Sequence, residues 1–88
     1  MSREELARIL EEAIAEYNKY HAPEAVASLI EVHEKSFLVK FSGPFCYTCG
    51  FYDYFDDFKY VLVDLGLKAE VSAVKETNEG ALVKYELR

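Results

Sequence analysis

Two stretches of the chain repeat apolar residues every three or four positions, which predicts two helices. The first stripe consists of Leu6, Ile9, Leu10, Ala13, Ile14 and Tyr17. The second consists of Phe51, Phe55, Phe58, Leu62 and Leu65. Ser2 and Glu5 have the form of a capping box at the start of the first helix. Pro23 and Gly66 mark where the two helices end.

The chain between the two predicted helices is rich in Val, Ile and Phe, which favour strands. We predict a first hairpin with strands at residues 25–32 and 36–41. In its second strand Phe37, Val39 and Phe41 occupy alternate positions, so these side chains are predicted to face the core. The first strand is apolar on both sides, so the pattern leaves its orientation open.

A second hairpin follows the second helix. We predict strands at residues 67–76 and 81–87, joined by a type I turn with Gly80 in the left-handed position. If Thr77 lies opposite Ala81, most charged side chains of both strands point to water. That register pairs Val71 with Leu87 and Ala73 with Tyr85.

Both halves of the chain have the order helix, strand, strand. A shift of 44 residues, half of the 88-residue chain, places one hairpin on the other without a gap. Under this shift Ser28 coincides with Ser72, Val39 with Val83 and Lys40 with Lys84. We interpret the chain as a single domain, residues 1–88, with repeat halves 1–44 and 45–88.

Two helix-hairpin units with apolar faces combine most simply into one four-stranded antiparallel sheet with both helices on one face. The predicted fold is therefore an α+β two-layer sandwich with the order αββαββ and a pseudo-twofold axis. Its order of elements resembles a circular permutation of the ferredoxin-like fold, in which the usual first strand has moved to the end of the chain. A shared fold implies no function.

The net charge and the hydrophobic pattern of the chain argue against two classes of partner, nucleic acids and membranes. The net charge is −6, and no cluster of Lys and Arg could neutralise several phosphates, so we expect no nucleic-acid partner. No apolar run approaches the roughly 18 residues of a membrane span, and the first ten residues form a charged amphipathic segment rather than a signal peptide. We expect a cytoplasmic protein, and abundant Glu and Lys without Gln favour a thermophilic source.

Cys46 and Cys49 form a C-x-x-C motif between the second strand and the second helix. Two thiols at this spacing can close a disulfide, and the unpaired amides at a helix start favour the thiolate. We therefore expect thiol/disulfide exchange, with Cys46 as the nucleophile. The local order is similar to that of thioredoxin-like sites, although the other elements of that fold and a Gly-Pro dipeptide between the cysteines are absent.

The same motif has two other interpretations. Cys46 and Cys49 supply half of a tetrahedral zinc site, but only His21 and His33 remain as nitrogen donors, and both are expected to be exposed turn residues. Alternatively, the cysteines are buried as small apolar residues or as a structural disulfide. Apart from zinc in the first alternative, no cofactor is expected.

Aromatic and acidic residues crowd the start of the second helix. Four aromatic side chains are candidates for contacting a protein partner or a small apolar ligand: Phe45, Tyr47, Phe51 and Tyr54. Asp53 and Asp57 lie one helical turn apart, but the helix dipole explains acids near a helix start. The chain has no Ser-His-Asp set, phosphate loop or second metal-ligand pair, so no standard enzyme class is assigned.

The side of the predicted sheet away from the helices also carries apolar residues. If the two hairpins are oriented alike, six side chains face outward: Val26, Ile30, Val32, Leu38, Val74 and Leu82. A second copy is the simplest cover for such a patch, so we expect a homodimer through this outer face. The alternative is that the first strand pairs in the other register and buries its apolar side chains. The competing functions are therefore dithiol exchange and a non-enzymatic homodimeric binding module.

Overall fold

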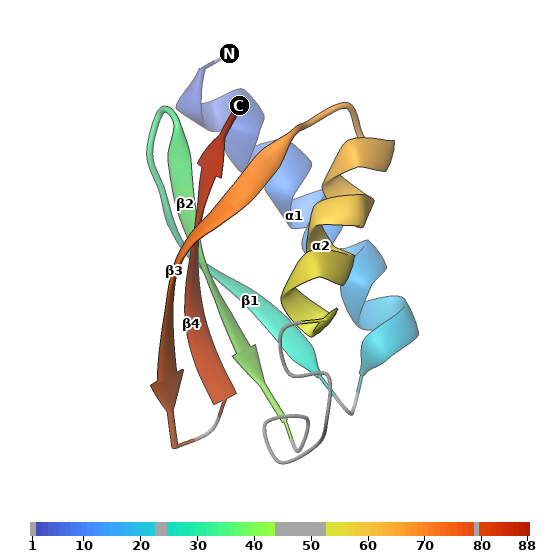
Figure 1. Cartoon of the computed structure of the whole chain (residues 1–88). Helices are drawn as coiled ribbons and strands as arrows, with labels where there is room; N and C mark the ends of the chain where they lie inside the picture. The colour runs from blue at the N-terminus through green and yellow to red at the C-terminus, as the bar shows by residue number, and fades with distance from the viewer. Residues whose placement is uncertain (1, 23–24, 44–52, 79) are drawn as a thin grey trace.

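The computed structural model describes residues 2–22, 25–43, 53–78 and 80–88 of the chain. Within these ranges it contains two helices and four strands in the predicted order αββαββ (Figure 1). The elements are α1 (Arg3–His21), β1 (Val26–Val32), β2 (Ser36–Ser42), α2 (Asp53–Asp64), β3 (Ala69–Thr77) and β4 (Gly80–Leu87). Each of the six elements predicted from the apolar pattern is therefore present.

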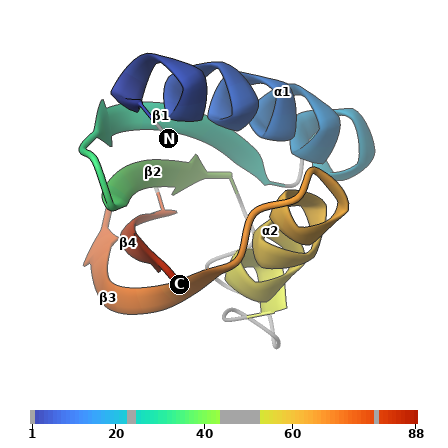
Figure 2. The same ribbon diagram turned by 90° about the horizontal axis from the view of Figure 1, so that it is seen from above.

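The four strands form one antiparallel sheet in the order β1-β2-β4-β3, so β2 and β4 are central and β1 and β3 are edge strands. Both helices pack on the same face of the sheet, which curls so that α2 lies on its open side (Figure 2). The predicted α+β two-layer fold is confirmed. This strand order is also the one that results when the first strand of a ferredoxin-like sheet is moved to the chain end.

Local hydrogen bonds explain where the helices begin and end. At the start of α1 the Ser2 hydroxyl oxygen accepts from the backbone N–H of Glu5 at 3.1 Å, which confirms the predicted cap. After α2, Gly66 adopts a φ of 88°, which a residue with a Cβ rarely does. The N–H of Leu67 then donates to the carbonyl of Leu62 at 2.9 Å, a bond typical of the Schellman motif.

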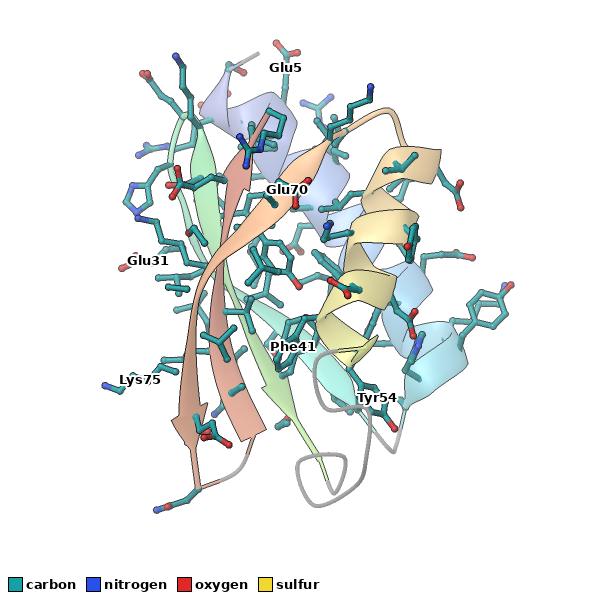
Figure 3. All side chains as sticks on the ribbon, in the orientation of Figure 1. Glu5, Glu31, Phe41, Tyr54, Glu70 and Lys75 are labelled. Carbon is teal, nitrogen blue, oxygen red and sulfur yellow. The ribbon has the colours of Figure 1, made fainter. Side chains whose placement is uncertain are left out.

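The core lies between the sheet and the helices and consists mainly of aromatic rings. Its largest fully buried side chains are Tyr17, Tyr85, Phe37, Phe41, Phe55, Phe58, Leu6, Leu10, Leu62, Val39 and Val83. Figure 3 shows Phe41 between the sheet and α2. The Tyr17 hydroxyl donates to the backbone carbonyl of Tyr54 at 3.1 Å. The Tyr85 hydroxyl donates to that of Phe55 at 2.9 Å, so buried tyrosines from α1 and β4 both fix the first turn of α2.

Asn18 joins α1 to the edge strand β1. Its side-chain amide donates to the carbonyl of Ala27 at 3.0 Å, and its side-chain oxygen accepts from the N–H of Ala27 at 2.7 Å. These bonds satisfy the two backbone groups that Ala27 turns away from the sheet. The end of α1 therefore covers part of the sheet edge and sits in a fixed position beside it.

Each edge strand contains one β-bulge, which changes the residues that face the core. The pairing of β1 with β2 skips Ile30, and the pairing of β3 with β4 skips Ser72. An extra residue moves the side chains that follow it to the opposite face. Val32 and Val74 therefore pair with buried residues of the central strands and pack against the core. The prediction that these two valines face away from the helices is wrong.

The second hairpin also differs from its predicted register. Thr77 pairs with Gly80 rather than with Ala81, and the pairs predicted for Val71 and Ala73 are wrong. The bulge accounts for the further shift along β3. Gly80 has a φ of 156° and lies so close to β2 that a Cβ on it would overlap the β2 backbone. The tight end of this hairpin therefore requires glycine at this position.

Candidate functional site

The residues predicted for redox or metal chemistry lie outside the described residues. They belong to the segment 44–52, between the end of β2 and the start of α2. This applies to Cys46 and Cys49 and to the aromatic candidates Phe45, Tyr47 and Phe51. The redox, zinc and ligand-binding roles of these five residues therefore remain predictions.

Tyr54 is the one predicted ligand contact within the described residues. It lies in the first turn of α2, and Figure 3 shows it where α2 begins, beside the end of α1. Its side chain is half-buried and packs against the core, with its ring centroid 6.2 Å from that of His21. Its backbone carbonyl accepts the hydroxyl of Tyr17. Tyr54 therefore contributes to the junction between the two helices.

His21, the last residue of α1, forms the polar part of this junction. Its ring stacks on Tyr17, with centroids 4.1 Å apart and planes 3° from parallel. Its Nε2 lies 3.2 Å from Oδ2 of Asp57, and its side chain is only 23% exposed. We call His21 and Asp57 the helix latch. Because α2 packs beside the end of α1, His21 is partly buried and is not the exposed turn residue that we predicted.

Both ring nitrogens of His21 face oxygen acceptors. Nδ1 lies 3.1 Å from the backbone oxygen of Tyr17, and Nε2 faces the Asp57 carboxylate. A carbonyl and a carboxylate can only accept, so the ring donates to both when both nitrogens carry protons. A neutral ring has one N–H and donates to one of these two acceptors. The helix latch therefore links the end of α1 to α2.

A groove of about 360 Å³ lies next to the helix latch, between α1 and α2. Its walls are formed by Glu12, Glu16 and Tyr20 of α1 and by Val61, Asp64 and Leu65 of α2. The three α1 residues follow one another at four-residue intervals, so they line one face of that helix. We call this the interhelical groove. Its volume is within the range of about 300 to 1,000 Å³ found for ligand pockets.

The interhelical groove combines an exposed aromatic ring with negative charge. Tyr20 is 71% exposed, although it is a large hydrophobic residue. Glu12, Glu16 and Asp64 supply three carboxylates, and none of them forms an ion pair with another residue in the described part of the chain. Glu12 and Glu16 are one helical turn apart, where two like charges cost about 0.2 to 0.5 kcal/mol. This arrangement therefore slightly lowers the stability of α1.

On the opposite flank of α2, a carboxylate forms an ion pair with a lysine. Lys59 Nζ lies 3.0 Å from Oε2 of Glu70 on β3. This hydrogen bond raises the pKa of Lys59 and lowers the pKa of Glu70. Both groups are solvated, so the pair adds little to stability. Lys59 is the single basic residue of α2. Its pairing with Glu70 holds it on the side of α2 away from the interhelical groove.

The outer face of the sheet is less apolar than predicted. Val26, Leu38 and Leu82 alternate with buried positions and are half-buried, while Ile30, at the bulge, is 49% exposed. Charged side chains interrupt this patch, and Figure 3 shows Lys75 pointing away from the helices. Four of the six residues predicted for the homodimer contact therefore lie on the outer face.

The sequence alone does not single out the groove residues. Glu12 and Glu16 belong to the charged face that any surface helix shows, and only the position of α2 separates them from Glu4 and Glu11. One signal was present. Glu12, Glu16 and Tyr20 share one helical face, and an aromatic ring is unusual on a solvated face.

In residues 2–22, 25–43, 53–78 and 80–88, no group of three or more His, Cys, Asp or Glu side chains is placed to hold a metal ion. Neither helix, over its described length, is long and apolar enough to cross a membrane. Comparisons with protein-family models, with curated proteins and with solved structures gave no match to this chain.

Proposed function

We propose that this protein is a non-enzymatic binding module that holds a segment of a partner protein in the interhelical groove. The observation that carries the proposal is the exposed Tyr20 ring, which lies in a groove between two helices beside carboxylates that form no ion pair among the described residues. Tyrosine is enriched among the residues that dominate the energy of protein interfaces. The binding of an amphipathic helix in a groove with apolar walls is a recurrent mode of peptide recognition.

The helix latch and the tyrosine hydroxyls support this proposal by holding the groove open before a partner arrives. His21 contacts Asp57 at one end of the helix pair, and Tyr17 anchors the first turn of α2. A surface that is already ordered loses less conformational entropy on binding. The groove is therefore suited to bind without rearrangement of the two helices.

Selection from a random peptide library displayed on phage tests this function. We expect the selected peptides to bind the wild type and to lose about tenfold in affinity for Tyr20→Ala, because the ring is a central contact. Tyr60→Ala is the matched control, since Tyr60 is 69% exposed on α2 but does not line the groove. Peptides that bind both variants equally, or a selection without binders, would contradict the proposal.

Thiol/disulfide exchange at Cys46 and Cys49 is the second candidate function. One observation favours it: β2 ends at Ser42 and α2 begins at Asp53, so the two cysteines precede a helix in the sequence, and a helix N-terminus favours the thiolate. A homodimer through the outer sheet face is compatible with either function. Sedimentation at micromolar concentration tests it, and a strict monomer would exclude it.

A further inference from the structure

We infer that the segment held in the interhelical groove is cationic and amphipathic, with two or three Lys or Arg side chains beside a large apolar one. This inference rests on the binding function proposed above. It adds the chemical class of the partner, which follows from the charge of the helices and from the composition of the groove.

The helices carry nearly all of the net negative charge of the chain. Together α1 and α2 contain nine Asp and Glu residues and four Lys and Arg residues, a net charge of −5 out of −6. The four strands contain four acids and three bases, a net charge of −1. A cationic partner is therefore attracted to the helix layer rather than to the sheet.

Inside the groove, the carboxylates stand on both walls. Glu12 and Glu16 lie on α1, and Asp64 lies on α2. A Lys or Arg side chain placed between the walls would pair with acids from both helices and relieve the repulsion between Glu12 and Glu16. The neighbouring cation of the chain, Lys19, lies over the Tyr20 ring at 5.5 Å and forms no ion pair with these three carboxylates.

The apolar residues that line the groove indicate that the partner also carries a large apolar side chain. Val61 and Leu65 pack against the core on one side and line the groove on the other, next to the exposed ring of Tyr20. A purely polar cation would leave this apolar surface in contact with water. A large aliphatic or aromatic side chain would cover it, at about 25 cal/mol per Å² of apolar surface removed from water.

The groove also sets the length of the segment. From Glu12 to Tyr20 the α1 wall spans nine residues, or eight steps of 1.5 Å along the helix, about 12 Å. A helical segment of about two turns, with its cations one turn apart, matches the spacing of Glu12 and Glu16. We therefore use helical peptides as probes.

Isothermal titration calorimetry with three synthetic peptides of roughly 14 residues, each about 20 Å long as a helix, tests the inference. The first peptide has leucines on one face of the helix and lysines on the other. The second has glutamate in place of every lysine, and the third has serine in place of every leucine. We expect binding of the first peptide, weakening as salt rises, because exposed charges are screened. We expect at least tenfold weaker binding of the other two.

Two charge variants locate the contact. Glu12→Gln combined with Glu16→Gln removes two groove carboxylates and should weaken the leucine–lysine peptide by about 2- to 30-fold, the range for two exposed ion pairs. Glu11→Gln combined with Glu86→Gln removes the same amount of negative charge at exposed positions outside the groove and should leave binding within about twofold. An equal loss in both variants would overturn the inference.

The outcomes for the inference and for the proposed function are distinct. If peptides selected by display need Tyr20 but carry no excess of Lys and Arg, or if the glutamate peptide binds as well as the lysine peptide, the binding function stands and the cationic partner is excluded. If no selected peptide depends on Tyr20, the proposed function itself fails. Binding of the lysine–serine peptide as tight as that of the leucine–lysine peptide would contradict the apolar part of the inference.

Discussion

The Nε2 atom of His21, at the end of α1, lies 3.2 Å from Oδ2 of Asp57 in α2, so a side-chain contact joins the two helices beside the interhelical groove. The stack of the His21 ring on the buried Tyr17 fixes the orientation of the His21 side chain. Because the groove is lined by both helices, their spacing at this point fixes its width.

Replacing His21 by alanine should destabilise the protein by about 1 to 2 kcal/mol, because it removes the polar contacts of the ring with Tyr17 and Asp57 and the stack on Tyr17. Urea unfolding followed by circular dichroism measures the difference. His33→Ala is the control, since His33 is 60% exposed and pairs with an exposed Glu31, so it should change stability by less than about 0.5 kcal/mol. Equal losses in both variants would exclude a structural role for the latch.

A second prediction concerns alkaline pH. Burial raises the pKa of Tyr85 well above its usual value of about 10. A raised pKa in the folded state gives stability that is complete below about pH 10 and is lost as the pH rises toward the folded value. Denaturant unfolding at a series of pH values should therefore show stability falling above about pH 10. In Tyr85→Phe this loss should be smaller, whereas Tyr20→Phe, at an exposed ring, should behave as the wild type.

The two glycines that follow helix and strand ends should differ in their tolerance of a methyl group. Gly66→Ala should cost about 1 kcal/mol, because only the positive φ is unfavourable and no atom lies near the added Cβ. Gly80→Ala should cost roughly 2 to 4 kcal/mol, because the Cβ would overlap the backbone carbonyl of Phe41 as well. Thermal melting of the two variants measures this order, and a reversed order would contradict the described path of β4.

The fold could be predicted from the sequence because its signals are local and repeated. The apolar stripes, the cap at Ser2 and the glycine at Gly66 each act within a few residues, and they agree with one another. The bulges at Ile30 and Ser72 have no comparable signal. A strand that is apolar on both sides fits either register, and only the packing of the whole sheet selects one. The predicted outer face was wrong at Val32 and Val74 for this reason.

The candidate site was harder to predict because it depends on contacts between distant residues. Asp57 was explained by the helix dipole alone, yet it contacts His21, which lies 36 residues earlier in the chain. Glu12 and Glu16 line a groove only because α2 packs beside α1 and brings Asp64 to the same groove. The C-x-x-C motif, which the sequence does display, lies outside the described residues and stays a prediction.

The two cysteines offer a direct test of the competing function. If Cys46 and Cys49 undergo dithiol exchange, both should react with a thiol reagent in the folded protein after reduction, and Cys46→Ser should abolish disulfide formation within the chain. Titration with Ellman's reagent and mass spectrometry measure both effects. Thiols that stay inaccessible until the protein unfolds, together with variants that change only the melting temperature, would exclude the redox function.

Amide chemical shifts give the most direct test of the interhelical groove. In a titration of the ¹⁵N-labelled protein with the leucine–lysine peptide, we predict the largest shift changes at Glu12, Glu16, Tyr20, Val61 and Asp64, and little change at Lys75 and Leu82 on the outer sheet face. The largest changes on the outer face, or in the segment 44–52, with the groove residues unaffected, would contradict the proposed binding site.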